Sequence, residues 1–194
     1  MQIDAEFVTS AAGAGGFPRD VLPEVALVGR SNVGKSSLIN ALARRTLART
    51  SAAPGKTRLA NFYRVTRGAT ALYLVDLPGY GYARGGDAAA AEFRQLTDAY
   101  FSRPKSVASL LLVDSRHPGL QSDLEAWDWL GAQQAPRGVV GTKVDKLTRA
   151  ERARHARELD SLFDVPVLLV STQSGEGIED LWKLIAKLPN RTAA

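Results

Sequence analysis

The 194-residue chain contains no cysteine and only two histidines, His117 and His155. The lack of cysteine excludes disulfides and thiolate metal sites, and two histidines so far apart do not suit a histidine-based zinc site. No apolar run reaches the roughly 18 residues of a membrane span, and the first residues, MQIDAEFVTS, carry acids where a signal peptide needs basic residues. We therefore expect a cytoplasmic protein with no membrane partner, and we interpret both histidines as surface or loop residues.

Acidic residues are missing from one long stretch, Val25 to Val75. Its basic residues are Arg30, Lys35, Arg44, Arg45, Arg49, Lys56, Arg58, Arg64 and Arg67. Because the whole chain carries a formal charge of +5 and this stretch +9, the remainder carries −4. The basic residues either keep one face soluble or meet phosphates, first those of a nucleotide and then those of a nucleic acid.

Apolar runs rich in β-branched residues alternate with helical patterns along the chain, beginning with VALV, KSSLINALARR, LANFYRVT and TALYLVD. This order predicts an α/β domain with a mostly parallel sheet and helices on both faces. We expect an antiparallel hairpin around Arg67 to Ala69, and a helix start at Thr148 with Glu151 as a capping box. Ser122 or Asp123 marks another helix start. We predict a flexible N-terminal arm over residues 1–20, a single domain over 21–190 and a tail over 191–194.

The stretch GRSNVGKSS, residues 29–37, follows a short apolar run. It fits the pattern G-x-x-x-x-G-K-[ST] between a buried strand and a helix, which is typical of a phosphate-binding loop. The glycines allow backbone N–H groups and the positive helix end to point at one anion. Lys35 would reach the β- and γ-phosphates, Ser36 would ligate Mg²⁺, and the Ser37 N–H would support the α-phosphate.

Four further stretches strengthen this prediction. DLPG, residues 76–79, follows a strand, where Asp76 can hold Mg²⁺ through water and the Gly79 N–H can meet a γ-phosphate. In TKVD, residues 142–145, Asp145 can accept hydrogen bonds from N1 and N2 of guanine, a pairing that adenine cannot make. Backbone N–H groups of VST, residues 170–172, can meet guanine O6. In PGKTR, Thr57 is a candidate second Mg²⁺ ligand.

Taken in their order along the chain, the five stretches resemble the G1 to G5 boxes of translation-factor-class GTPases. PEVALVGRSNVGKSSLINAL, TSAAPGKTRLANFY, DLPGYGYA, LLLVDSRHPGLQSDLEAWDWL and TKVDKL further resemble the EngB family (also called YihA or YsxC), bacterial GTPases of ribosome assembly, over roughly residues 20–188. The resemblance implies a P-loop NTPase fold of the Ras-like type, with six or seven strands of which one is antiparallel. It also implies GTP and GDP binding with Mg²⁺ and a monomer that assists large-subunit assembly on ribosomal RNA, with roles in growth, cell division and septation.

Carried over by position, the resemblance assigns nucleotide contacts to five segments. They are Gly29, Arg30, Ser31, Asn32, Val33, Gly34, Lys35, Ser36 and Ser37; Gly55, Lys56, Thr57, Arg58 and Leu59; Asp76, Leu77, Pro78 and Gly79; Thr142, Lys143, Val144 and Asp145; and Val170, Ser171 and Thr172. Ser36, Thr57 and Asp76 form the expected metal site. Lys35, Thr57 and Asn32 are the expected catalytic residues.

Two positions bear on the rate of hydrolysis. Tyr80 stands where Ras-like enzymes place a water-orienting glutamine, and with a pKa of about 10 a tyrosine is a poor base, so we expect slow turnover. Tyr80 is either a hydrophobic switch residue or a catalytic one. Asn32 is either a turn residue or, as in related GTPases with asparagine there, a ligand for K⁺ that neutralises charge in the transition state.

Three function classes remain open. The first is a GTP-timed assembly factor on ribosomal RNA. The second is an enzyme that couples nucleotide turnover to another reaction, although the chain shows no long basic lid. The third is a polymerising GTP-dependent scaffold, although the chain has almost nothing beyond one core domain. The polarised charge favours the assembly factor.

Overall fold

The computed structural model describes residues 2–48, 59–80, 86–103 and 107–190. Its strands are β1 (Ile3–Ala11), β2 (Glu24–Gly29), β3 (Ala60–Arg67), β4 (Thr70–Asp76), β5 (Val107–Asp114), β6 (Arg137–Thr142) and β7 (Val167–Leu169). Its α-helices are α1 (Lys35–Ala43), α2 (Gly86–Phe101), α3 (Gln121–Ala132), α4 (Arg149–Leu162) and α5 (Ile178–Lys187). Short 3₁₀ turns are η1 (Ala14–Gly16), η3 (Val144–Lys146) and η4 (Leu188–Asn190).

The seven strands form one sheet in the order β1-β3-β4-β2-β5-β6-β7. β3 runs antiparallel to both of its neighbours, and the other neighbouring strands pair in parallel. β3 is therefore the one strand of opposite direction, as the sequence predicted. The predicted hairpin joins β3 to β4, and Arg67 pairs with Thr70 beside its turn.

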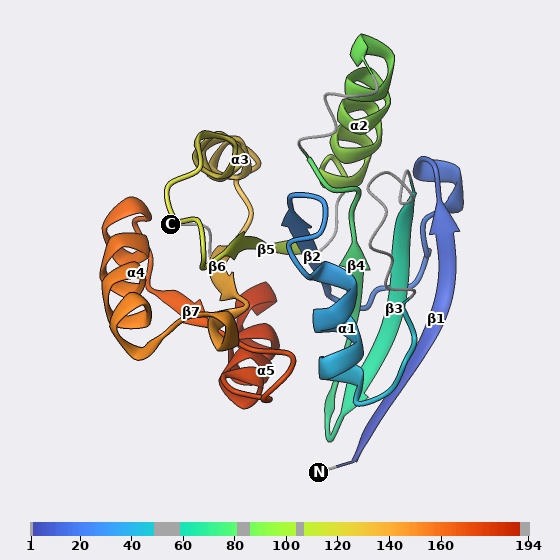
Figure 1. Cartoon of the computed structure of the whole chain (residues 1–194). Helices are drawn as coiled ribbons and strands as arrows, with labels where there is room; N and C mark the ends of the chain where they lie inside the picture. Colours follow the sequence, from blue (N-terminus) through green and yellow to red (C-terminus); the bar gives the residue numbers. More distant parts are fainter. Residues whose placement is uncertain (1, 49–58, 81–85, 104–106, 191–194) are drawn as a thin grey trace.

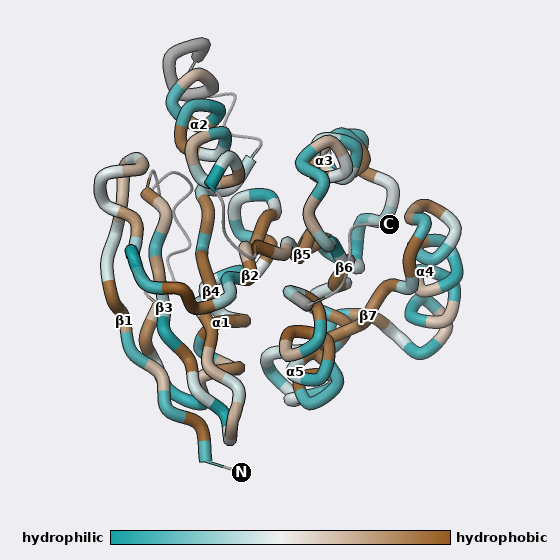
Figure 2. The backbone as a smooth tube through the Cα atoms, turned by 180° about the vertical axis from the view of Figure 1, so that it is seen from behind, coloured by the Kyte–Doolittle hydropathy of each residue, from teal (hydrophilic) through white to brown (hydrophobic). Residues whose placement is uncertain are grey.

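Helices cover both faces of the sheet (Figure 1). Along β2, Val25 and Leu27 face the core shared with α1 and α5, whereas Ala26 and Val28 face the core shared with α2 and α3. This alternation follows from the twofold period of a strand, and burial of both faces explains why EVALV is apolar throughout. Figure 2 shows the hydrophobic residues concentrated on the strands at the centre.

The prediction of a flexible arm over residues 1–20 is wrong for most of that segment. Residues 3–11 form β1, which pairs with β3 along its length with an irregularity between Phe7 and Thr9. Phe17 is buried against Phe62 and Tyr100, with ring centroids 5.6 and 6.0 Å apart. The arm was predicted from the Ala- and Gly-rich run TSAAGAGG, residues 9–16, and β1 was missed because the strand is held by a partner far along the chain. The domain therefore includes residues before 21.

The helix starts agree only in part with the sequence patterns. The capping box is confirmed, since Thr148 and Glu151 bond each other's backbone N–H at the start of α4. The prediction for α3 is wrong by two or three residues, because its N-cap is Leu120 rather than Ser122 or Asp123. Gly119, at φ 75°, turns the chain just before it. Asp123 therefore lies inside the first turn, where its side chain is available for another contact.

Candidate functional site

Residues 29–37 lie between the carboxyl end of β2 and the start of α1. Gly34 adopts a left-handed conformation, φ 114°, which glycine favours, and it is the N-cap of the helix. No acidic residue occupies the first turn of α1. The positive end of the helix and its free N–H groups are therefore directed at this loop without a carboxylate to neutralise them, an arrangement suited to an anion.

Lys35 is the first residue of α1 and is only 9% exposed. Its Nζ donates hydrogen bonds to the backbone oxygens of Gly29, at 3.2 Å, and Arg30, at 3.4 Å. Burial lowers the pKa of this ammonium, although Asp76 nearby opposes the shift. The loop thus folds around the buried ammonium group of Lys35, which its backbone oxygens hold in place.

Asp76, at the carboxyl end of β4, faces the start of α1. The Ser36 hydroxyl donates to its Oδ2 at 3.2 Å, whereas its Oδ1 is buried without a hydrogen-bond partner in the part of the chain that the structure describes. Burial raises the pKa of Asp76, with Lys35 and Ser36 opposing. A carboxylate oxygen left without a partner beside a serine hydroxyl fits a hard cation such as Mg²⁺, which takes a few protein oxygens and otherwise water and phosphate.

The segment after β4 lies against residues 29–37, called here the phosphate-type loop. The Leu77 N–H donates to the Leu27 oxygen at 3.4 Å, and Tyr80 forms an isolated parallel bridge with Arg30. A Cβ added at Gly79 would lie 2.7 Å from the Ser31 nitrogen, so no larger residue fits without movement. This close approach gives a physical reason for the glycine of DLPG.

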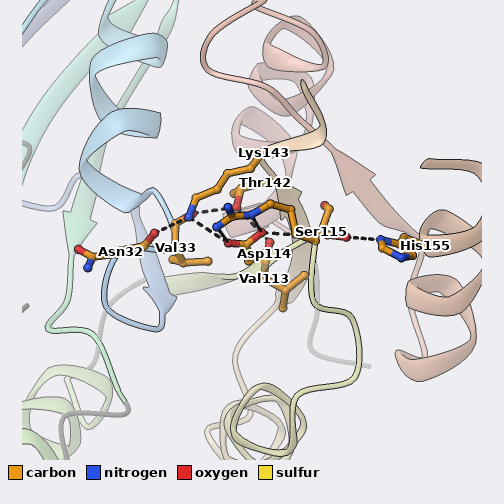
Figure 3. A network of polar contacts seen from close by, with 9 residues as sticks. Asn32, Val33, Val113, Asp114, Ser115, Thr142, Lys143 and His155 are labelled. Atoms are coloured by element: carbon orange, nitrogen blue, oxygen red, sulfur yellow. Dashed lines mark hydrogen bonds and ion pairs between the residues drawn. The ribbon is translucent and has the colours of Figure 1, made fainter. Parts of the chain in front are cut away.

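The carboxyl end of β6 is joined to the same loop (Figure 3). The Thr142 hydroxyl lies 2.8 Å from the Val33 oxygen and 3.1 Å from the Val113 oxygen, and its single proton is shared between these two acceptors. Lys143 has a left-handed backbone, φ 62°, and its Nζ donates to the Asn32 oxygen at 2.7 Å. Two consecutive residues of TKVD therefore fix two consecutive carbonyl groups of the loop, although the segments lie 109 to 111 residues apart.

Asp145 lies beside the segment that follows β7. Ser171 Oγ donates to Asp145 Oδ1 at 2.6 Å and in turn accepts from the N–H groups of Gln173 and Ser174. The Ser171 hydrogen bond is the main cause of the lowered pKa of Asp145, and Lys146, 3.6 Å away, adds to it. Asp145 is therefore an ionised, acceptor-only group at neutral pH.

The structure brings four of the five predicted segments to one edge of the sheet, where the parallel strands β2, β4, β6 and β7 end. Of the fifth, Gly55, Lys56, Thr57 and Arg58 lie outside the described residues, and Leu59 is exposed immediately before β3. The roles expected of Thr57, as a metal ligand and a catalytic residue, therefore stay predictions.

Three residues of this edge were not predicted as site residues: Asp114, Arg116 and Asp123. Asp114 ends β5 and accepts from Lys143 Nζ at 2.9 Å and from the Arg116 guanidinium. Asp123 on α3 accepts from the Tyr80 hydroxyl at 2.8 Å. The signal for Asp114 was present, because LLLVD places an acid at the end of an apolar strand as ALYLVD does for Asp76. The sequence marks Asp123 only as a possible helix start and gives no local sign of its contact with Tyr80.

The hydroxyl of Tyr80 donates to Asp123 on α3. Burial raises the pKa of Tyr80 well above its ordinary value, and the neighbouring Asp123 adds to this effect. A phenol with so high a pKa does not act as a base near neutral pH, which agrees with the interpretation of Tyr80 as a switch residue rather than a catalytic one.

The acid-free stretch does not form one basic face. Arg67 pairs with Glu179 on α5 and lies over the Trp182 ring, and Arg44 also contributes to the lowered pKa of Glu179. Arg64 is three residues earlier on β3 and so projects to the other face. There it influences Tyr73, whose hydroxyl donates to Asp20. The expectation of a single face was wrong because a strand distributes consecutive residues between two sides.

Comparison with known proteins adds independent findings. Residues 24–143 match the family described as 50S ribosome-binding GTPase. The chain is 43% identical over 188 residues to a probable GTP-binding protein EngB of Heliobacterium modesticaldum, covering 94% of this chain and 90% of the relative. It is 45% identical over 181 residues to that of Chlorobaculum tepidum, covering 91% and 93%.

Solved structures agree on the fold. A crystal structure of Aquifex aeolicus Era bound to GDP and AlF4⁻ superposes with a TM-score of 0.69 at 22% identity, covering 87% of this chain and 57% of that one. In the part of this chain that the structure describes, no helix has the length and apolar character needed to cross a membrane.

Proposed function

Since this chain belongs to the EngB family of GTP-binding proteins, we propose that it binds GTP and GDP with Mg²⁺, hydrolyses GTP slowly, and acts as a switch in assembly of the large ribosomal subunit. The observation that carries the proposal is the joining of TKVD to the phosphate-type loop by Thr142 and Lys143. These contacts hold a guanine-reading carboxylate and a phosphate-binding loop in one fixed arrangement.

The phosphate end of the site rests on α1 and β4. Lys35 would exchange its two backbone acceptors for phosphate oxygens, and the N–H groups of the loop and the first turn of α1 would donate to the same anion. Ser36 and Asp76 would hold Mg²⁺, with Thr57 as a further ligand in the GTP state. Mg²⁺, when bound, would neutralise negative charge on the phosphates.

The base end of the site rests on Asp145. An ionised carboxylate accepts from N1–H and N2–H₂ of guanine, whereas adenine presents a lone pair at N1 and would leave the carboxylate unpaired. The stem of Lys143 would cover the ring. Of the three N–H groups expected to meet O6, those of Val170 and Ser171 already donate to the backbone oxygens of Gly141 and Glu176, at 2.7 and 3.0 Å, so this role falls to the Thr172 N–H. Ser171 fixes the rotamer of Asp145 before nucleotide arrives.

Hydrolysis by this site would depend on charge neutralisation rather than on a protein base. Tyr80 is held by Asp123, and its raised pKa makes it unable to accept a proton from water near pH 7. Lys35, Thr57 and a K⁺ ion bound by Asn32 would stabilise charge on the leaving phosphate. Because position 80 lacks a glutamine to orient water, we infer slow turnover until a partner supplies the missing group.

The proposed partner is the large ribosomal subunit or its precursor, contacted through ribosomal RNA. The description of the matched family and the positive net charge support this inference. We infer that the protein acts as a monomer in the cytoplasm, and that loss of this assembly step would disturb growth, cell division and septation.

Two measurements test the proposal. In a competition titration, GTP and GDP should displace a fluorescent guanine nucleotide far better than ATP does, and removal of Mg²⁺ should weaken GTP binding. The protein should co-sediment with large-subunit particles more strongly with a non-hydrolysable GTP analogue than with GDP. Equal affinity for ATP and GTP would contradict the guanine assignment, and particle binding indifferent to nucleotide would contradict the switch.

A further inference from the structure

Asp114 is the centre of the polar network drawn in Figure 3, and the proposed function assigns it no role. Its carboxylate accepts hydrogen bonds from Nε and a terminal nitrogen of Arg116, at 2.9 and 2.7 Å, and from the Arg116 backbone N–H at 3.1 Å. Oδ2 also accepts a hydrogen bond from Lys143 Nζ at 2.9 Å. The Asp114 carboxylate, at the end of β5, therefore contacts two positively charged side chains on the edge of the sheet where the predicted nucleotide-binding segments meet.

The contacts keep Asp114 ionised. Burial acts to raise its pKa, but the hydrogen bonds from Arg116 and Lys143 outweigh burial and hold the pKa well below the ordinary range. The side chain of Asp114 is only 12% exposed, whereas that of Arg116 is 40% exposed and closes the network on the solvent side. The bidentate fork of arginine fixes the plane of the carboxylate, which in turn fixes the position of Oδ2.

Lys143 is the group whose position depends on that oxygen. Its long side chain has four rotatable bonds and loses considerable entropy when it is held in one conformation. Here its ammonium has two anchors, the Asn32 oxygen on the phosphate-type loop and Asp114 Oδ2 on β5. The ammonium makes a charge-assisted hydrogen bond to both acceptors, but only the carboxylate adds the attraction of an opposite charge.

We propose that Asp114 is a positioning residue for the nucleotide base: it holds the Lys143 side chain extended across the base site, with Arg116 holding Asp114. This inference rests on the proposed function, because it names the group that prepares the Lys143 stem to cover guanine. Ordering the stem before nucleotide binds removes an entropy cost from binding and slows dissociation.

The test is nucleotide dissociation from the full chain, measured by displacing a fluorescent GDP with excess GDP in a stopped-flow instrument. Asp114→Asn keeps the shape of the side chain and removes its charge. We expect GDP, GTP and inosine diphosphate to dissociate about tenfold faster, because Lys143 loses its charged partner and keeps at most a neutral acceptor at this position. The factor should be the same for all three, because neither the γ-phosphate nor the N2 amine of guanine touches Lys143.

A double-mutant cycle separates positioning from a general structural effect. Lys143→Met keeps the stem and removes the ammonium, so Asp114→Asn should have no further effect on dissociation in that background. Arg116→Met changes an exposed position and should speed dissociation about threefold if Arg116 fixes the carboxylate, so the network is tested even if Asp114→Asn does not fold. Additive effects of Asp114→Asn and Lys143→Met would overturn the proposal.

Asp164→Asn is the matched control. Asp164 also accepts from an arginine and a ring N–H, Arg137 and Trp127, but Arg137 is at the opposite end of β6 from the site. Its substitution should leave dissociation unchanged. A wild-type protein that binds no guanine nucleotide would refute the proposed function itself, whereas wild-type binding with dissociation unchanged in Asp114→Asn and Arg116→Met would refute only the role of Asp114.

Discussion

Two aspartates at the carboxyl edge of the sheet, Asp145 and Asp76, differ in their hydrogen bonds and in the direction of their pKa shifts. Asp145 is ionised, with a short hydrogen bond from Ser171 at Oδ1 and the Lys146 ammonium 3.6 Å from Oδ2, so the side chain is held as an acceptor-only group. Asp76, by contrast, has a buried oxygen without a partner in the described part of the chain and a raised pKa. The first group is ready for hydrogen-bond donors on a base, and the second is ready for a cation.

Asp145→Asn should change which base the protein prefers. The amide can no longer accept from both N–H groups of guanine, but its NH₂ can donate to the 2-carbonyl of xanthine. We expect GTP affinity to fall by at least about a hundredfold, the loss of two hydrogen bonds to a charged acceptor, and xanthosine triphosphate to become the better ligand. Competition titration with both nucleotides measures this. A variant that still prefers GTP would show that another group reads the base.

Asn32→Ala tests the ion at the phosphate-type loop. Asn32 has a left-handed backbone, φ 63°, and its carbonyl is held by Lys143, so the residue has a defined structural role. If its amide oxygen also binds K⁺, single-turnover GTP hydrolysis should be faster in K⁺ than in Na⁺ at equal ionic strength. The substitution should remove that difference while changing GDP affinity little. Equal rates of the unmodified protein in the two salts would leave Asn32 as a turn residue.

At the scale of elements, contacts between the ends of strands and neighbouring helices join the nucleotide segments. Tyr80, after β4, donates to Asp123 on α3, and the DLPG segment is thereby attached to that helix. The segments themselves could be predicted, because each is a short local pattern after an apolar strand. The pairs Tyr80–Asp123, Lys143–Asp114 and β1–β3 could not, since each joins residues far apart in the chain and depends on strand order.

The Tyr80–Asp123 contact predicts a pH-dependent gain in stability for Asp123→Asn. Asp123 is 2% exposed, and burial raises its pKa, with Tyr80 and Arg30 opposing and Asp114 adding to the shift. An acid whose folded-state pKa is raised lowers stability as the pH rises above its unfolded-state pKa, and the cost is complete above the folded-state pKa. Below about pH 4 it is protonated in the folded and unfolded states alike, and the cost disappears.

The amide can still accept from Tyr80 without a charge. Asp123→Asn should therefore melt about 2–4 °C higher than the parent at pH 7 to 8, the shift that roughly 1 kcal/mol gives a chain of this size, and the difference should close toward pH 4. Thermal melting across this range measures it. Asp123→Ala, which leaves the Tyr80 hydroxyl without an acceptor, serves as the control and should be less stable throughout. A gain independent of pH would contradict burial of a charge as its cause.

For the whole molecule, the distribution of arginines decides how it can meet RNA. Arg44 and Arg45 are exposed at the end of α1, on the face that carries α5, whereas Arg64 is exposed on the face of β3 that carries Tyr73. A flat RNA surface can therefore engage one set or the other, but not both at once. The two sets provide a matched pair of variants.

We predict that charge reversal at Arg44 and Arg45 weakens binding to large-subunit particles and lowers the slope of log affinity against log salt. Removing one arginine–phosphate interaction should reduce that slope by roughly one. Arg64→Glu should leave both quantities nearly unchanged. Co-sedimentation over a series of salt concentrations measures the slope, and the reverse ranking of the two variants would assign RNA binding to the face of Arg64.

The packing of α5 has a consequence for truncation of the domain. Leu181, Trp182 and Ile185 are buried in the core that also contains the inner side of α1 and β2. Without α5, the apolar strand residues beneath it would be exposed to water. Shortening this helix should therefore leave an aggregating product rather than a smaller working domain.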